Sequence, residues 1–161
     1  MEARAHHDIA FTLNRAEICA TVAIDTTAFD LIRNQFGLTS VRSACDGIGM
    51  CGACTILVDG LSTASCLLLA IDLDAKNVET VESLMSEEIL HPLQQAFVDK
   101  GAIQCGYCTA GMLLAAKALL NECSKPSREQ IRRGLSGNLC RCTGYTKIVD
   151  AIESVSDGDR L

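Results

Sequence analysis

The first half of the chain alternates apolar and polar positions with the period of two that is typical of β-strands. Four segments with this pattern are expected to be strands: residues 8–13, 18–23, 55–58 and 78–81. A turn over the four residues between the first two strands would pair them as a hairpin, and the turn pair Asp59-Gly60 ends the third strand. Between the second and third strands, Phe29, Ile32 and Phe36 recur at helical spacing. The pattern predicts a small mixed sheet with one helix.

In the second half, apolar positions recur with the helical period instead. Four helices are expected there: residues 90–98, 109–120, 128–135 and 145–155. The third begins with the capping-box pattern Ser127-x-x-Gln130. His91 stands just before Pro92, which marks it as a residue that starts a helix rather than as a metal ligand. Four short, adjacent helices predict a bundle.

The two patterns meet near residues 82–88, where charge rises and the strand pattern ends. We therefore expect two domains, at residues 1–82 and 83–161. The fold class predicted is α+β. A β-grasp domain of the plant-type ferredoxin kind is followed by a four-helix-bundle domain, and each domain carries its own group of cysteines.

Composition narrows the classes of function. The 161 residues are 48% hydrophobic and carry a formal charge of -6, which favours small globular domains over disorder and argues against binding to nucleic acid. The longest apolar runs fall well short of the roughly 20 residues that span a bilayer, so no membrane segment is expected. Since the N-terminal residues form no apolar stretch of a secretory signal, the sequence predicts a cytoplasmic protein.

Ten cysteines are unusual for a chain in a reducing compartment, where they indicate metal or redox chemistry rather than disulfides. Eight of them fall into two sets of four. The first set is Cys45, Cys51, Cys54 and Cys66, and the second set is Cys105, Cys108, Cys140 and Cys142. Cys19 and Cys123 lie outside both sets and are expected to be buried or half-buried apolar residues.

The first set has three cysteines on one glycine-rich loop and a fourth that follows after eleven residues. Gly47, Gly49 and Gly52 allow the backbone to curl around a metal group and to aim N–H donors at it. Structural zinc sites are typically built from paired C-x2-4-C knuckles, whereas this arrangement is closer to that of plant-type ferredoxins. The first set therefore favours a [2Fe-2S] cluster over zinc.

The second set combines a C-x2-C pair with a C-x-C pair, each shortly before a predicted helix. Helix N-termini carry partial positive charge and free N–H groups, which suit an anionic iron–sulfide core. Four thiolates at this spacing also suit zinc. The spacing alone leaves zinc and [2Fe-2S] both open for the second set.

Three motifs carry a resemblance to a known family. They are CDGIGMCGACT at residues 45–55, QCGYCTAGM at 104–112 and GNLCRCTGY at 137–145. Together they resemble the small iron–sulfur subunit of the xanthine oxidase, or molybdenum hydroxylase, family, over residues 9–155. The resemblance implies one [2Fe-2S] cluster in each domain, the second set included.

The resemblance also implies a role and partners. The chain would relay electrons from a molybdopterin centre in a large partner subunit, through the helical-domain cluster and then the ferredoxin-like cluster, to FAD in a medium partner subunit. Gln104 matches the family residue that hydrogen-bonds the pterin, and Cys142 matches the ligand whose sulfur approaches the pterin edge. The complex implied is a dimer of heterotrimers that hydroxylates an aromatic N-heterocycle or an aldehyde.

Three positions depart from the family pattern. Five residues separate Cys45 from Cys51 where the family usually has four, Ala44 stands where glycine is common, and Ala110 stands where proline is usual. The first departure affects the register of the loop and the choice of N–H donors, and it leaves the four expected ligands unchanged. Proline at a first-turn position is helpful but not required.

The rival hypotheses are a zinc-stapled interaction module with two four-cysteine sites and a free-standing soluble ferredoxin. The zinc module predicts a colourless protein, whereas iron–sulfur centres absorb visible light. The free-standing ferredoxin predicts a stable isolated chain. An electron-transfer subunit instead keeps a cluster edge and an apolar face for its partners.

Overall fold

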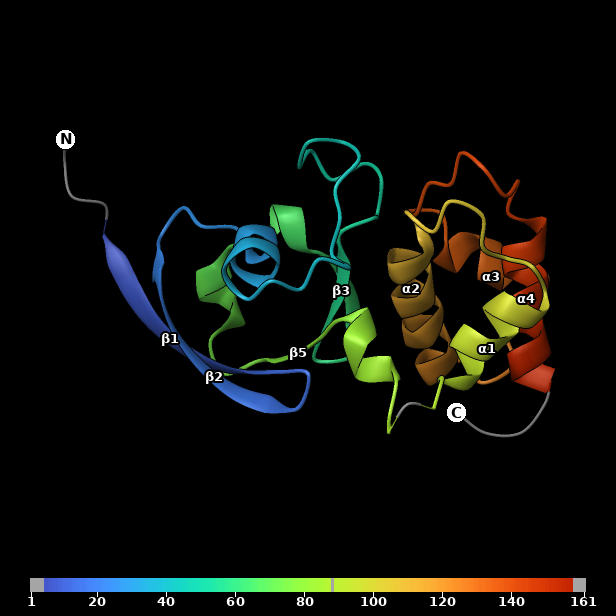
Figure 1. Cartoon of the computed structure of the whole chain (residues 1–161), viewed down its shortest axis with the longest axis horizontal. Helices are drawn as coiled ribbons and strands as arrows, with labels where there is room; N and C mark the ends of the chain where they lie inside the picture. Colours follow the sequence, from blue (N-terminus) through green and yellow to red (C-terminus); the bar gives the residue numbers. More distant parts are fainter. Residues whose placement is uncertain (1–4, 88, 158–161) are drawn as a thin grey trace.

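The computed structural model describes residues 5–87 and 89–157. Its architecture is mixed α and β, with a five-stranded sheet from the first half of the chain beside four α-helices from the second half (Figure 1). The change of period along the sequence thus corresponds to a change of structure in space.

Strands β1 (His6–Leu13) and β2 (Ala16–Ala23) form the expected antiparallel hairpin, with Leu13 opposite Ala16. The turn is two residues long rather than four, because Asn14 and Arg15 both adopt positive φ, at 50° and 73°. Two such residues in succession match the twist of the flanking strands. The hairpin prediction is confirmed with a tighter turn.

The sheet is completed by β3 (Thr55–Val58), β4 (Leu61–Ala64) and β5 (Asn77–Glu79). Its strand order is β2-β1-β5-β3-β4. The β1–β5 pair is parallel and the other neighbours are antiparallel, so the sheet is mixed as expected. The predicted fourth strand is shorter than the pattern indicated, because the chain turns into a 3₁₀ helix at Val81–Leu84.

The single helix expected in the first half is a short π-helix, Asp30–Gln35. Its start is held by Thr27, whose Oγ1 accepts the N–H of Asp30 at 3.1 Å. Leu31 and Ile32 are fully buried in it. Gly37 then takes a φ of +72° and leads the chain away.

The four predicted helices of the second half are all present and begin within two residues of their expected starts. They are α1 (Pro92–Asp99), α2 (Thr109–Glu122), α3 (Arg128–Gly134) and α4 (Thr146–Asp157). Ser127 and Gln130 form the expected capping box. Arg128 at the start of α3 pairs with Asp150 at 2.7 Å and with Glu153, which ties α3 to α4.

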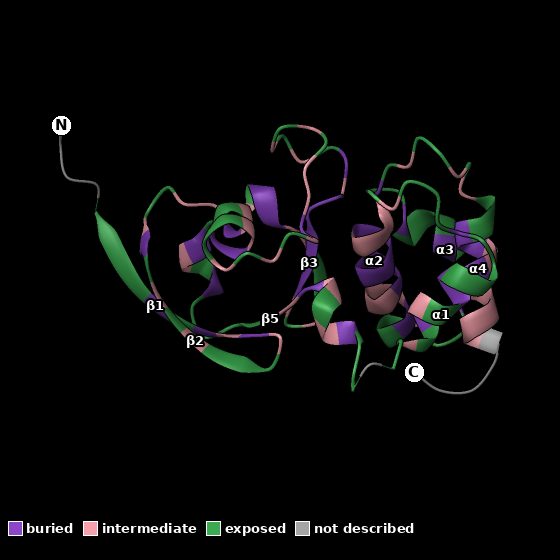
Figure 2. Ribbon diagram, viewed as in Figure 1, coloured by how far each residue is buried: buried purple, intermediate pink, exposed green. Residues whose placement is uncertain are grey.

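Two hydrophobic cores lie on opposite sides of β3. Ile56 is buried in the core of the sheet, while its neighbour Leu57 is buried in the core of the helices, because successive strand residues point to opposite faces. Helix α2 packs against β3, so buried segments of the two halves adjoin there (Figure 2). One strand therefore carries side chains of both cores and holds the two halves together.

The two cysteines outside the sets differ in exposure. Cys123 is half-buried, as expected, whereas Cys19 is exposed on β2, so the prediction for Cys19 was wrong. Its neighbour Ile18 packs against the core of the sheet, and successive strand residues face opposite sides, so Cys19 points away from that core. Among the described residues, no helix is both long enough and apolar enough to cross a membrane.

His91 caps α1, as predicted, and this makes the stability of the fold sensitive to pH. Its Nδ1 accepts the N–H of Leu93 at 3.2 Å, which only the neutral ring can do. Burial, together with the charge of Lys117, lowers the pKa of His91 below its ordinary value. At pH values between that lowered pKa and about 6.5, the His91 ring binds more protons in the unfolded chain than in the folded chain. The stability that the neutral cap contributes is therefore lost as pH falls through this window.

We predict that the His91→Asn variant loses less unfolding free energy than the parent when pH is lowered from about 7.5 to about 5. Asparagine keeps an N-cap acceptor but does not titrate, and the cap contributes about 1 kcal/mol. Urea unfolding followed by far-UV circular dichroism at both pH values measures the difference. Identical pH slopes for parent and variant would contradict the assignment.

Candidate metal centres

The first cysteine set meets at the start of the β3–β4 hairpin. Cys54 immediately precedes β3 and Cys66 follows β4, and the register that pairs Thr55 with Ala64 brings the two cysteines together. Their sulfurs lie 3.4 Å apart. Cys45 and Cys51, on the loop before β3, form a second pair through a hydrogen bond between their thiols.

The loop that carries Cys45 and Cys51 turns tightly through residues with positive φ. Gly47, Gly49 and Gly52 have φ values of 83°, 77° and 68°, which glycine adopts without strain. The added residue between Cys45 and Cys51 is accommodated within this loop, since the two thiols still meet.

Backbone N–H groups point at the sulfurs of the first set. The N–H of Ala44 donates to the Cys51 sulfur at 3.4 Å, and a hydrogen bond from the Met50 backbone lowers the pKa of Cys45 to about 6. Burial acts in the other direction and raises the pKa of Cys66 to about 11. The loop thus supplies donors for negative charge on sulfur, while Cys51, Cys54 and Cys66 are buried away from water.

The second set is gathered from two loops beside the helices. Cys105 and Cys108 lie just before α2, and Cys140 and Cys142 lie between α3 and α4. The sulfurs of Cys105 and Cys142 are 3.5 Å apart, and Cys108 and Cys140 are joined by a hydrogen bond between their thiols. The structure therefore brings the eight predicted cysteines together in the two expected sets. Within each set, the thiols form two contacting pairs.

Donors also face the second set. The N–H and the hydroxyl of Thr143 both donate to the Cys140 sulfur, at 3.4 and 3.0 Å. A hydrogen bond from the Tyr107 backbone lowers the pKa of Cys105, and burial raises the pKa of Cys108 to about 12. The sequence did not single out Thr143, although it stands inside the third motif directly after Cys142.

The sulfur–sulfur spacing within a pair suits two thiolates bound to one tetrahedral metal. Two thiolates on one tetrahedral metal with bonds of about 2.3 Å stand about 3.8 Å apart, and the two sulfur–sulfur distances given above lie slightly inside that value. In the described part of the chain, no group of three or more His, Cys, Asp or Glu side chains is arranged to hold a single metal ion. Four thiols in two pairs, with N–H donors aimed at sulfur, fit a [2Fe-2S] cluster at each set.

A cavity of about 430 Å³ lies between the two sets. Six cysteines from both sets line it: Cys45, Cys51, Cys105, Cys108, Cys140 and Cys142. Met50, Tyr107 and Leu139 add apolar surface to its wall. The two candidate centres therefore share one hollow between the halves of the molecule.

Exposure differs between the sets. Cys51, Cys54 and Cys66 are buried, whereas Cys105 and Cys142 are exposed at the surface. Gln104 is also exposed, directly before Cys105. The second set thus presents an open edge, and Gln104 lies beside it.

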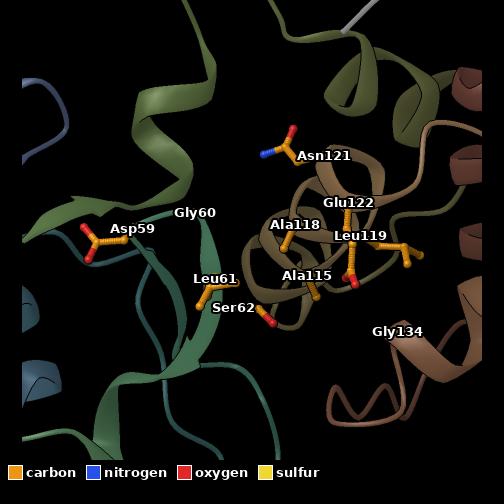
Figure 3. Close-up of a pocket in the computed structure, with 10 residues that line it drawn as sticks. All are labelled: Asp59, Gly60, Leu61, Ser62, Ala115, Ala118, Leu119, Asn121, Glu122 and Gly134. Carbon is orange, nitrogen blue, oxygen red and sulfur yellow. The ribbon is translucent and has the colours of Figure 1, made fainter.

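A second cavity, of about 460 Å³, lies between the β3–β4 turn and α2 (Figure 3). Asp59 and Glu122 contribute carboxylates to it, and Leu61 and Leu119 contribute apolar surface. It has none of the paired thiols that characterise the first cavity, so the candidate chemistry belongs to the hollow between the cysteine loops.

The two halves approach each other most closely at glycines beside the cysteines. A Cβ on Gly111, in the first turn of α2, would stand 2.3 Å from the carbonyl oxygen of Gly52. A Cβ on Gly52 would stand 2.3 Å from the carbonyl oxygen of Gly137. Both positions need glycine because backbone atoms, which cannot move aside cheaply, occupy the space.

Comparison with known proteins gives a consistent set of relatives. The family model for a [2Fe-2S] binding domain matches residues 80–153. The chain is 49% identical over 134 residues to the nicotine 6-hydroxylase small subunit of Paenarthrobacter nicotinovorans, covering 82% of this chain and 80% of that one. It is 48% identical over 123 residues to the nicotinate dehydrogenase small FeS subunit of Eubacterium barkeri, covering 76% of this chain and 78% of that one.

The fold has a solved counterpart. A chain of quinoline 2-oxidoreductase from Pseudomonas putida 86 superposes with a TM-score of 0.90 at 43% identity, covering 94% of each chain. These relatives are parts of oxidoreductases, and they give no support for the zinc-stapled module.

We predict that Gly111→Ala lowers the free energy of unfolding, whereas Gly137→Ala changes it little. Overpacking against the Gly52 carbonyl costs about 1–3 kcal/mol, more than the roughly 0.5–1 kcal/mol that alanine contributes to a helix. A Cβ on Gly137 would have no other atom within 4 Å, so this position is the matched control. Urea unfolding measures the free energy of unfolding of both variants. Equal values for Gly111→Ala and Gly137→Ala would show that Gly52 does not approach α2 tightly.

Proposed function

The chain belongs to the small iron–sulfur subunits of the molybdenum hydroxylase family, and from that premise we propose how it serves its complex. We propose that it relays electrons from a molybdopterin centre in a large partner subunit, through two [2Fe-2S] clusters, to FAD in a medium partner subunit. The observation that carries this proposal is the cavity between the halves, because thiols of both sets line it.

Each cluster would be held by one set of four cysteines, with each iron bound by one sulfur pair. In the first set the pairs are Cys45 with Cys51 and Cys54 with Cys66; in the second set they are Cys105 with Cys142 and Cys108 with Cys140. A [2Fe-2S] cluster, when bound, supplies reversible storage of a single electron.

Hydrogen-bond donors of this chain would stabilise the negative charge that such clusters bring. The N–H groups of Ala44 and Thr143 and the hydroxyl of Thr143 donate to sulfur and offset negative charge. Burial of Cys54 and Cys66 excludes water from the inner pair.

In the proposed order, electrons enter at the second set and leave from the first, and the difference in exposure between the sets supports this order. Cys105, Cys142 and Gln104 present the open edge of the second set, which suits contact with a molybdopterin in the large subunit. In this proposal the amide of Gln104 hydrogen-bonds the pterin, and the Cys142 sulfur approaches its edge. Ile48 and Met50, which are 64% and 65% exposed beside the first set, suit contact with the FAD-binding medium subunit.

We further propose a β-grasp, ferredoxin-like domain at residues 1–82 and a four-helix-bundle domain at 83–161. The two hydrophobic cores and the mixed sheet support this division. The assembly proposed is a dimer of heterotrimers in the cytoplasm, where a reducing environment keeps the cysteine thiols free.

The substrate of the complex is proposed to be an aromatic N-heterocycle, with an aldehyde as the second candidate. Nicotine 6-hydroxylase, nicotinate dehydrogenase and quinoline 2-oxidoreductase are each named for an aromatic N-heterocycle. A relative named aldehyde oxidoreductase supports an aldehyde as the second candidate. Substrate chemistry belongs to the partner subunits, because this chain contains no nucleotide-binding glycine motif of its own.

We expect the purified chain, with whatever subunits accompany it, to contain about four irons per copy and to be coloured. After reduction with dithionite, low-temperature electron paramagnetic resonance should show two distinct [2Fe-2S] signals. Zinc in place of iron, with no such signal in protein isolated without exposure to air, would remove the electron-transfer proposal.

Single cysteine substitutions should separate the two centres. Cys140→Ser is expected to damage the second-set signal and stop substrate-driven turnover while the first-set signal remains, because it removes one thiolate of one iron. Cys51→Ser should do the reverse and block only reduction of the flavin. Cys19→Ser, the same change on an exposed strand outside both sets, should leave both signals unchanged.

Iron content and the two resonance signals read each site independently of turnover. If Cys140→Ser or Cys51→Ser retained both signals and full flavin reduction, the ligand assignment would be wrong.

A further inference from the structure

The loops that carry the two cysteine sets are hydrogen-bonded to each other at a buried junction. Asn138 is only 5% exposed, and its side-chain Nδ2 donates to the carbonyl oxygen of Gly52 at 2.9 Å and to Oγ1 of Thr55 at 3.2 Å. The backbone N–H of Leu139 donates to the carbonyl oxygen of Cys51 at 2.9 Å. The residues just before Cys140 therefore bind the first loop at Cys51 and its neighbours.

Close packing of backbone atoms surrounds this junction. The Gly52 carbonyl also accepts the N–H and the hydroxyl of Thr55, at 3.2 and 2.7 Å. Because Gly52 and Gly111 have no side chains, the Gly52 carbonyl reaches the first turn of α2. The first loop is thus bound to both parts of the helical half that carry cysteines.

A second contact joins the loops elsewhere on the shared hollow. Arg42 donates from Nη1 to the carbonyl oxygen of Gly106 at 2.8 Å and lies over the Tyr107 ring, 5.4 Å from its centroid. The Tyr107 hydroxyl donates back to the carbonyl oxygen of Ser43 at 2.8 Å. Arg42 and Ser43 precede Cys45 in one loop, whereas Gly106 and Tyr107 separate the two cysteines of the other.

We propose that Asn138 is a positioning residue that fixes the separation of the two iron–sulfur centres, with the Arg42–Tyr107 contact as a second, more exposed attachment. The inference rests on the proposed function, since it concerns the distance between two clusters in one relay. Asn138 reaches neither cluster in this proposal. It acts through the Gly52 carbonyl and the loop that holds Cys51 and Cys54.

Such a junction matters because electron transfer between two centres falls steeply as their separation grows. The two halves have separate cores, and outside the junction they are joined mainly where α2 packs on β3. A buried amide that donates two hydrogen bonds at once restricts both the distance and the rotation of one loop against the other. The relay then keeps one separation regardless of motion in the partners.

The test compares Asn138→Asp with Asn121→Asp in the full chain purified with its accompanying subunits. Aspartate has the shape of asparagine but presents only acceptors to the Gly52 carbonyl at neutral pH. Asn121 is exposed on α2, so the control makes the same chemical change away from the junction. Iron content shows whether both clusters are retained, and the magnetic interaction between the two reduced clusters, which falls with the inverse cube of distance, reports their separation.

Asn138→Asp is expected to keep both resonance signals and to narrow the splitting that arises from the interaction between the clusters. Hydrogen exchange at the Leu139 amide should accelerate by about 5- to 150-fold, the change that corresponds to loss of a buried hydrogen-bonded contact. The control should match the parent in both measurements. Unchanged splitting and unchanged exchange in Asn138→Asp would overturn the proposal.

Asn138→Ala covers the case in which the aspartate variant fails to fold. Thr55 still donates twice to the Gly52 carbonyl, so alanine leaves no charge and no unpaired acceptor there. The splitting that arises from the interaction between the clusters is expected to narrow in Asn138→Ala as well, and Asn121→Ala is the control. An unchanged splitting in Asn138→Ala would again overturn the proposal. A parent chain that lacks two iron signals would instead reject the proposed function itself, and this inference with it.

Discussion

The two thiols of each pair must be held in contact, and the two pairs of each set must be held near each other, against the cost of burial and of mutual repulsion. This constraint shapes the rest of the structure. Its cost is visible in Cys66 and Cys108, whose pKa values burial raises to about 11 and about 12. Donors offset it. The N–H groups of Met50 and Tyr107 favour the thiolates of Cys45 and Cys105.

Each set is held by the core on its own side of the molecule. The hairpin register that joins β3 to β4 places Cys54 beside Cys66, and the packing of α2 with the α3–α4 loop places Cys108 beside Cys140. Strand β3 belongs to both cores through Ile56 and Leu57. The two sets therefore meet at one interface because the same strand anchors both halves.

Because the two sets are unequally exposed, the surface beside one set differs from the surface beside the other. Cys54 and Cys66 are buried behind the hairpin, whereas Cys105 and Cys142 reach the surface next to Gln104. A protein that accepts electrons from one partner and passes them to another needs such distinct faces. In the proposed relay, the open edge receives electrons and the apolar rim of the first loop faces the next carrier.

The sequence by itself determined four of the five described strands, the four helices and the grouping of the cysteines into two sets, because periodicity, capping and cysteine spacing are local properties. It missed β4, which is recognised only as the partner of β3. It did not determine that Cys105 pairs with Cys142, that Cys19 is exposed, or that residues 30–35 form a π-helix. Asn138 stood within the third motif, yet its contact with Gly52 joins positions 86 residues apart. Only the tertiary structure decides such contacts, because they depend on how two separately formed cores pack against a shared strand.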